Sequence, residues 1–216
     1  IPRKLRSYLN TICFPSGLKE PSSYYRAKTY IPMCLHTSTA PEVWDDITTA
    51  FQELVYKTLD AVPGTRDAIY YPIGELLINI VEHSKATIGG VLAQTYPMKS
   101  YIDICIADNG RGFKGAYKQE RGFDFMDHDA IRTALGGKST KQIDGRGFGL
   151  HTSKRMISEG LSGSVFICSG DSAFLSGEVF NNEKLINIKD FSWPGVIIMF
   201  RVPIPTGPID ASLYYE

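Results

Sequence analysis

Residues 136–157 read GGKSTKQIDGRGFGLHTSKRMI, in which Gly145, Gly147 and Gly149 occupy alternate positions ahead of an apolar helical run. Glycines in front of a helix leave backbone N–H groups open to an anion, and the helix dipole adds to the attraction. The spacing G-x-G-x-G is neither a dinucleotide fingerprint nor a Walker-A loop. A glycine triplet alone is a weak signal, so its interpretation depends on two segments upstream.

The first upstream segment reads ELLINIVEHS over residues 75–84. At about 100° per residue, Glu75, Asn79 and Glu82 fall on one face of a helix, opposite the apolar residues. An amide oxygen is a hard ligand that suits Mg²⁺, and a carboxylate one turn earlier can hold or deprotonate a water molecule. Taken alone, the segment is explained equally well as a solvated helix face.

The second upstream segment is DNGRG at residues 108–112, directly after the strand-like run YIDICIAD. Its glycines permit positive φ and a close approach of the backbone to a flat ligand. Asp108, at the end of a strand, can accept a hydrogen bond from an exocyclic amine. Asn-Gly is also a common turn signal, so a simple strand-ending turn is the alternative for this segment by itself.

In this order and spacing, the three segments resemble the N, G1 and G2 boxes of the GHKL ATPases. This superfamily includes histidine kinases, gyrase-type topoisomerases, mismatch-repair ATPases and the serine kinases that act as anti-sigma factors. The resemblance covers about residues 68–202. It is closest to the histidine-kinase and anti-sigma branch, because His83 follows Asn79 by four positions and a Ser/Thr-Lys pair precedes the last box.

The resemblance implies roles for individual residues. Glu75 would be catalytic, orienting the attacking water or accepting the substrate proton, and Asn79 would be the Mg²⁺ ligand. Asp108 would bind the adenine amine. The other residues expected to contact the nucleotide are His83, Gly110, Gly112, Lys141, Gly145, Arg146, Gly147, Phe148, Gly149 and Leu150.

Some of these assignments have alternatives. Lys141 and Arg146 are the best positive charges for the γ-phosphate, but a solvated position suits either of them nearly as well. His83 can equally be a plain histidine at a helix end.

Three features depart from the histidine-kinase pattern. Glu82 stands where histidine kinases often carry Lys, and Val196 stands where the family often has a Thr beside the adenine. No phospho-acceptor helix of the H-[ED]-x-x-x-P kind precedes the domain, and the surroundings of His36 do not resemble one. A complete sensor kinase within these residues is therefore not expected.

Hydrophobic periodicity predicts the remaining elements. A strand is expected at 29–35, at a sheet edge because of Pro32. A helix follows, with Pro41 in its first turn and Thr39 as a candidate cap. A second helix covers about 68–85, and Pro72 either precedes its regular part or kinks it. Further predictions are helices near 128–135 and 148–159 and strands near 88–95, 100–107, 163–169, 173–180 and 196–202.

The element order implies α+β layers with a mostly antiparallel or mixed sheet. Together with the resemblance, it predicts a two-layer α/β sandwich of the GHKL (Bergerat) type, with helices on one face of a mixed sheet. Residues 1–28 are expected to form a lead-in arm, 29–205 the ATP-binding domain and 206–216 a tail. The stretch 113–144 belongs to a Gly- and charge-rich segment too long for an ordinary connection, which predicts a lid.

Composition narrows the function classes. The chain has 216 residues, 43% of them hydrophobic and 21% charged, which suits one domain with a real core. Its net charge of zero gives no basic footprint for nucleic acid. With no long apolar run and no visible signal peptide, we expect a cytoplasmic protein without a membrane span. The four cysteines form no C-x-x-C pair, which favours buried free thiols.

The function predicted from these observations is ATP binding with Mg²⁺-dependent phosphoryl transfer, to water or to a partner protein, coupled to lid closure. This would make the chain an ATPase or a protein kinase of the histidine-kinase-like type. The alternative is a nucleotide-responsive regulatory module of the anti-sigma type with little or no turnover. The expected ligands are ATP, ADP and Mg²⁺, and the resemblance also favours a partner protein and a homodimer.

Overall fold

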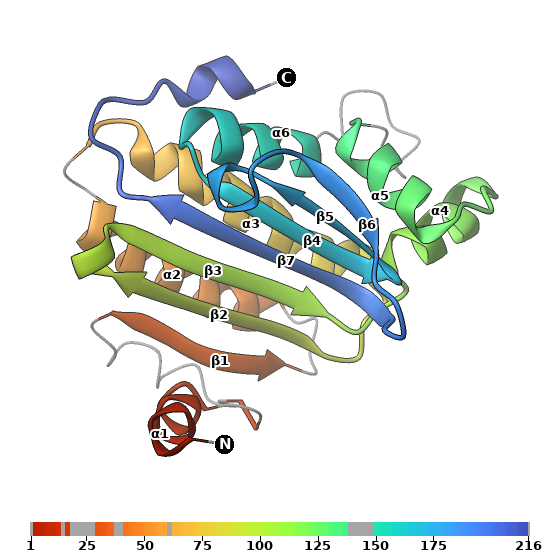
Figure 1. Ribbon diagram of the computed structural model, residues 1–216, viewed down its shortest axis with the longest axis horizontal. Helices are drawn as coiled ribbons and strands as arrows, with labels where there is room; N and C mark the ends of the chain where they lie inside the picture. Colours follow the sequence, from red (N-terminus) through yellow and green to blue (C-terminus); the bar gives the residue numbers. More distant parts are fainter. Residues whose placement is uncertain are drawn as a thin grey trace.

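The computed structural model describes residues 2–13, 16–17, 29–36, 41–59, 62–137 and 149–215. In this part of the chain, seven strands form one sheet in the order β1-β2-β3-β7-β4-β5-β6 (Figure 1). The strands are β1 (Tyr30–His36), β2 (Gly89–Tyr96), β3 (Tyr101–Asp108), β4 (Ser164–Gly170), β5 (Ser172–Ser176), β6 (Lys184–Asn187) and β7 (Trp193–Pro203).

The longest helices lie against one face of this sheet. Figure 1 shows α2, α3 and α6 behind the sheet, with α4 and α5 together at one end of it. The helices are α1 (Arg3–Thr11), α2 (Pro41–Leu59), α3 (Thr65–His83), α4 (Gly112–Arg121), α5 (Asp127–Leu135) and α6 (Gly149–Arg155), which continues as a π turn over Met156–Gly160. The predicted two-layer α/β sandwich is therefore confirmed.

Every pair of neighbouring strands is antiparallel, which is one of the two arrangements that the element order implied, whereas the predicted GHKL-type sandwich had a mixed sheet. The difference comes from the position of β7. Strands β3 and β4 run in the same direction and are joined through helices, an arrangement that ordinarily produces a parallel pair. Because β7 is inserted between them and runs opposite to both, no parallel contact forms.

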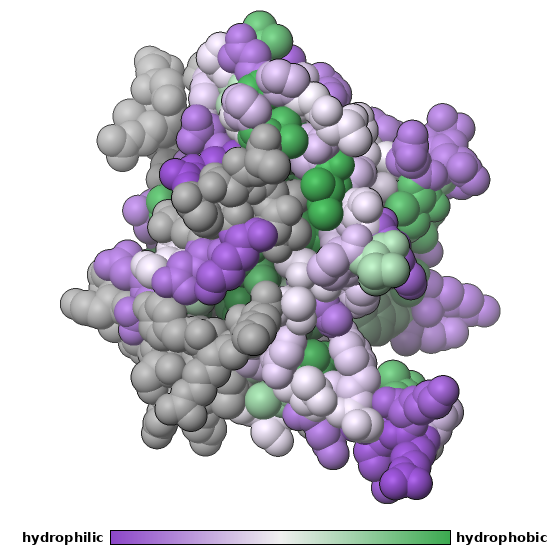
Figure 2. Space-filling model, turned by 90° about the vertical axis from the view of Figure 1, so that its left-hand side faces the viewer, coloured by the Kyte–Doolittle hydropathy of each residue, from purple (hydrophilic) through white to green (hydrophobic). Residues whose placement is uncertain are grey.

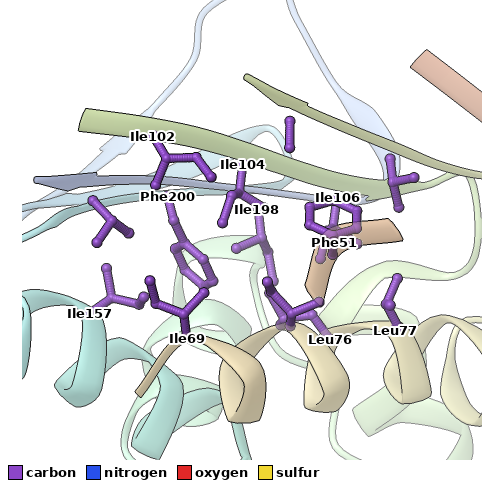
Figure 3. Packing of buried hydrophobic residues seen from close by; sticks show 14 of the residues in the cluster. Phe51, Ile69, Leu76, Leu77, Ile102, Ile104, Ile106, Ile157, Ile198 and Phe200 are labelled. Carbon is purple, nitrogen blue, oxygen red and sulfur yellow. The ribbon is translucent and has the colours of Figure 1, made fainter. Parts of the chain in front are cut away.

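The core lies between the sheet and its helical layer (Figure 3). In β3 the predicted alternation is confirmed, because Ile102, Ile104 and Ile106 are at most 3% exposed and the residues between them face the other side. Helix α3 supplies the predicted apolar stripe, all of it at most 4% exposed: Ile73, Leu76, Leu77 and Ile80. Fully burying such a side chain stabilises the fold by about 1.5–3 kcal/mol.

The three proline predictions have different outcomes. Strand β1 lies at the sheet edge, and its register with β2 shifts between Ile31 and Cys34, around Pro32, as expected for a residue without an N–H group. Helix α2 begins at Pro41, while Thr39 lies outside the described residues. Helix α3 already begins at Thr65 and runs through Pro72, so its regular part does not start after the proline.

Several elements were not predicted from the sequence. They are helix α1 within the expected arm, helix α4 directly after the DNGRG turn, and the short edge strand β6. Strand β5 ends at Ser176, earlier than expected, and a 3-10 turn follows it. All four cysteines are free, as predicted, although Cys13 and Cys105 are only partly buried.

The face of the sheet away from the helices carries paired polar groups. Arg201 on β7 binds Asp103 on β3 through two hydrogen bonds of 2.7 and 2.8 Å, and its guanidinium lies 4.2 Å from the centre of the Tyr101 ring. Figure 2 shows the end of the molecule away from α4 and α5, where apolar residues occur in small separate patches. No helix within the described ranges combines the length and apolar character needed to cross a bilayer.

Candidate functional site

Helix α3 positions the first two predicted site residues. Its apolar stripe is packed against the sheet, so Glu75 and Asn79 fall on another face, where both are partly buried. The helix ends four residues after Asn79, whose carbonyl oxygen accepts the N–H of Ser84 at 3.1 Å. One helix thus carries the carboxylate and the amide at successive turns and then ends beside the next site segment.

The Glu75 carboxylate lies against the first residue of α6. A Cβ atom added at Gly149 would collide with Glu75 Oε2, so a larger residue at this position would displace the Glu75 carboxylate. Tyr71, one turn before Glu75, has a raised pKa because of burial and, secondarily, because of the nearby Glu75 charge. Its ring packs edge-on against Tyr215 at 5.1 Å between centroids. The carboxylate therefore lies between α3 and the start of α6, near Tyr71.

Asp108 ends β3 as a buried carboxylate, only 6% exposed. Burial raises the pKa of Asp108, and hydrogen bonds from the backbone N–H groups of Gly110 and Val196 partly offset the effect. The Gly110 bond is 2.7 Å long, and the indole N–H of Trp193 donates to the Asp108 carbonyl at 2.7 Å. Strand β7 thus contributes directly to the surroundings of Asp108.

Gly112 and Asn109 give the DNGRG turn its shape. Gly112 has φ +61° where α4 begins, a backbone conformation that side chains disfavour. Asn109 accepts hydrogen bonds from the N–H groups of Thr87 and Ile88 at 3.0 and 2.8 Å, which ties the turn to the start of β2. The Asn of the motif is therefore structural.

Arg111 joins the DNGRG turn to the end of α3 and to α4. Its backbone N–H donates to the Ser84 carbonyl and its Nε to the His83 carbonyl, both at 2.8 Å. The guanidinium also contacts Gln119 and Glu120 on α4. The imidazole Nε2 of His83 lies 3.5 Å from a carboxylate oxygen of its neighbour, Glu82. His83 thus lies at the Asp108 end of α3, and its contact with a nucleotide stays a prediction.

The stretch predicted as a lid contains two helices, not one short one. The start of α5 is tied to the β4–β5 turn, because Asp127 Oδ2 accepts the N–H of Asp171 at 3.2 Å. Its end is tied to α6, where His151 Nδ1 lies 2.6 Å from the carbonyl oxygen of Leu135. Helix α5 therefore connects the sheet with the beginning of α6.

The remaining predicted residues divide into two groups. Leu150 is 8% exposed and belongs to the hydrophobic core, so its position supports packing of α6. The others lie outside the described residues, namely Lys141, Gly145, Arg146, Gly147 and Phe148.

Four residues near Asp108 were not predicted as site residues: Arg111, Ser169, Trp193 and Gly195. Trp193 and Gly195 lie in the first three residues of β7, and a Cβ atom at Gly195 would collide with both the carbonyl and the carboxylate of Asp108. The sequence signal for them was the Trp-Pro-Gly run itself, in which glycine follows proline at the start of a strand. Arg111 lies inside the DNGRG motif, and only its tertiary contacts reveal that it links the turn to α3 and α4.

The oxygen atoms of Glu75 and Asn79 suit a metal ion that also binds the phosphates of a substrate. Within the described ranges, no three His, Cys, Asp or Glu side chains gather so that they could hold a metal ion by themselves. Mg²⁺ ordinarily keeps several waters and binds through one or two protein oxygens together with substrate phosphates. The Asn79 amide and the Glu75 carboxylate, one turn apart, fit that mode of binding.

Comparison with known proteins gives one match. The family described as histidine kinase-, DNA gyrase B-, and HSP90-like ATPase matches residues 64–202. No curated protein and no solved structure matches the chain. The matched range begins with α3 and ends in β7, and it contains all three motif segments. Because this range is more than half of the chain, the protein belongs to the family of histidine kinase-, DNA gyrase B- and HSP90-like ATPases.

Proposed function

We propose that the chain binds Mg²⁺-ATP along helix α3 and transfers the γ-phosphoryl group to water or to a partner protein. Membership of the family supports ATP binding. The observation that carries the finer proposal is that one helix contacts both other motif segments. Glu75 meets Gly149 at the start of α6, and Ser84 meets the turn that follows Asp108. These two contacts are nine residues apart, about 13.5 Å at the helical rise, which suits an extended nucleotide.

The adenine would lie at the Asp108 end. A carboxylate offers about four acceptor positions on its two oxygens, and the backbone N–H groups of Gly110 and Val196 use only part of them. An exocyclic amine could donate to the remainder. Because burial disfavours the ionised carboxylate, a donor that binds this form returns part of the desolvation cost. A buried, partly paired acceptor is therefore well suited to select an amine-bearing base.

The phosphates would lie at the Glu75 end, near the beginning of α6. Asn79 would be the protein ligand of Mg²⁺, whose charge neutralises the phosphates during transfer. The Glu75 carboxylate would orient the attacking hydroxyl and accept its proton. The position of the Glu75 carboxylate beside Gly149, at the start of α6, supports this role, because the phosphates would lie there.

Lid closure over 113–144 is part of the proposal. The hydrogen bond between Leu135 and His151 links the last turn of α5 to the first turn of α6. A phosphate that binds at the beginning of α6 would therefore act directly on the end of α5. Helix α4 is linked to the other end of the site through Arg111, so both helices could respond to nucleotide.

One observation favours the alternative, a nucleotide-responsive switch with little turnover. The connection between α4 and α5 exposes Phe123 (51%) and Met126 (59%), next to Phe125, whose ring lies 5.4 Å from that of Tyr117. An exposed apolar group beside the predicted lid is the kind of surface that a partner protein binds. Nucleotide could control such a surface without hydrolysis.

Replacing Asp108 with Asn tests the adenine end. The variant should weaken ATP and ADP binding equally, because the contact is to the base and not to the phosphates. Losing a hydrogen bond to a charged group costs on the order of 1.5–3 kcal/mol, or roughly 10- to 150-fold in affinity. Calorimetry measures both affinities, and Asp103→Asn, on the outer face of the same strand, is the matched control. Unchanged ADP affinity in folded Asp108→Asn protein would remove Asp108 from the site.

Replacing Asn79 with Ala tests the metal end. The dependence of ATP affinity on Mg²⁺ should disappear, because the amide oxygen is the proposed metal ligand, while the fold should stay intact. Affinity is measured with Mg²⁺ and with a chelator. Ile78→Ala, the preceding residue and 46% exposed, controls for truncation on the same helix turn. A variant that retains the full Mg²⁺ effect contradicts the assignment.

Replacing Glu75 with Gln tests catalysis. Glutamine keeps the packing against Gly149 but cannot accept a proton. ATP should still bind, and phosphate release or label transfer to a partner should fall by about 10²–10⁴-fold. Glu82→Gln, two turns later on α3, is the matched control. If the parent protein binds ATP but neither releases phosphate nor labels a partner, the switch becomes the better interpretation.

A further inference from the structure

Three neighbouring strands end side by side at the Asp108 end of the site. Asp108, Val196 and Ser169 come from β3, β7 and β4, and the register pairs Ser169 directly with Val196. Ser169 continues the buried alternation of Val165 and Ile167 along β4, so its side chain points toward the helical layer, as Asp108 does on β3. A carboxylate, an isopropyl group and a hydroxyl therefore follow one another across the sheet.

The Ser169 hydroxyl is almost fully enclosed and makes two hydrogen bonds. It donates to the Gly195 carbonyl at 2.9 Å and accepts the N–H of Phe113 at 3.2 Å, while the residue is only 2% exposed. One side chain thus bridges the first residues of β7 and the first turn of α4. These two segments are far apart in sequence and border Asp108 from different sides.

Both bridged segments are tightly fitted. Gly195 lies against the Asp108 carboxylate so closely that any side chain would collide with it. A Cβ atom at Gly112 would lie 2.7 Å from Ser169 Oγ. The two segments also approach each other directly, because a Cβ atom at Gly195 would lie 2.6 Å from the Gly110 nitrogen. The Ser169 hydroxyl lies where they meet and bonds to the carbonyl of one and to the N–H that follows the other.

We propose that Ser169 is a positioning residue for the base-binding end of the site. Its hydroxyl fixes Gly195 and the start of α4 around Asp108, so that the carboxylate meets the adenine in a single geometry. The proposal rests on the proposed function and adds a residue to it. Val196, the register partner, has no hydroxyl, so this polar link is made from the neighbouring strand.

The loss of this hydroxyl should act on the nucleoside alone. Ser169→Ala leaves a buried carbonyl and a buried N–H without their partner, which loosens the surroundings of Asp108 without removing its carboxylate. We expect affinity for adenosine, ADP and ATP to fall by roughly 3- to 10-fold each, the range of a neutral hydrogen bond. Binding of inorganic tripolyphosphate, which has no base, should not change.

The matched control is Ser172→Ala. Ser172 is fully buried on the adjacent strand β5, and its hydroxyl bonds Asp171 and Asn187 at 2.8 and 3.1 Å, away from the DNGRG turn. Its loss should leave nucleoside affinity unchanged. A spectroscopic readout comes from Trp193, which donates to the Asp108 carbonyl. With Trp44, the second of the two tryptophans, replaced by Phe, the fluorescence response of Trp193 to ADP should change in Ser169→Ala and not in Ser172→Ala.

The outcomes separate this inference from the proposed function. Full ADP affinity and an unchanged Trp193 response in Ser169→Ala overturn the inference. If Asp108→Asn still weakens binding, only the Ser169 assignment fails; if it does not, the base-binding site itself is wrong. Equal losses for tripolyphosphate and adenosine would indicate general destabilisation and would also overturn it. If Ser169→Ala unfolds below the assay temperature, Ser169→Cys, which keeps an unbranched, slightly larger side chain with a weaker donor, is measured against the same criteria.

Discussion

The packing of α3 against both other motif segments is the constraint on which the site depends. The Glu75 carboxylate fills the space that a larger residue at position 149 would occupy, so such a residue would displace it from the start of α6. Helix α3 ends at the Ser84 carbonyl, which receives the N–H of Arg111. Helix α3 therefore fixes the spacing between the two ends of the proposed nucleotide site, and the sheet holds α3 through its buried apolar stripe.

At the other end of the site, hydrogen bonds compensate only part of the cost of burying the Asp108 carboxylate. Asp108 is enclosed by β7 and the DNGRG turn, and desolvation raises its pKa despite two backbone donors. Such a carboxylate costs stability unless a further donor reaches it. Groups from distant segments maintain this arrangement, among them the Trp193 indole and the Ser169 hydroxyl. We infer that the fold tolerates the cost because a base with an amine completes the pairing.

The sequence predicted those parts of the fold that depend on local pattern. The alternating apolar residues of β3 fit only a strand, and the apolar stripe of α3 fits only a helix, so both elements were predicted correctly. Helix α4 was missed because glycines and charges weaken its helical pattern; burial of Ala116 and Tyr117 holds it in place. Strand β6 is short and mostly exposed, and the insertion of β7 between β3 and β4 leaves no local trace. The contacts of Ser169 and Gly195 with the Asp108 region join residues far apart in sequence, which no motif spacing reveals.

Binding of an adenine nucleotide at the Asp108 end of the sheet can be followed by an amide NMR titration of the parent protein with Mg²⁺-ADP. We expect the largest shifts at the N–H groups of Gly110 and Val196, which bond the Asp108 carboxylate, and little change at Tyr96 and Tyr101 at the opposite end of the sheet. Saturable binding that leaves the Gly110 and Val196 resonances unmoved would contradict it.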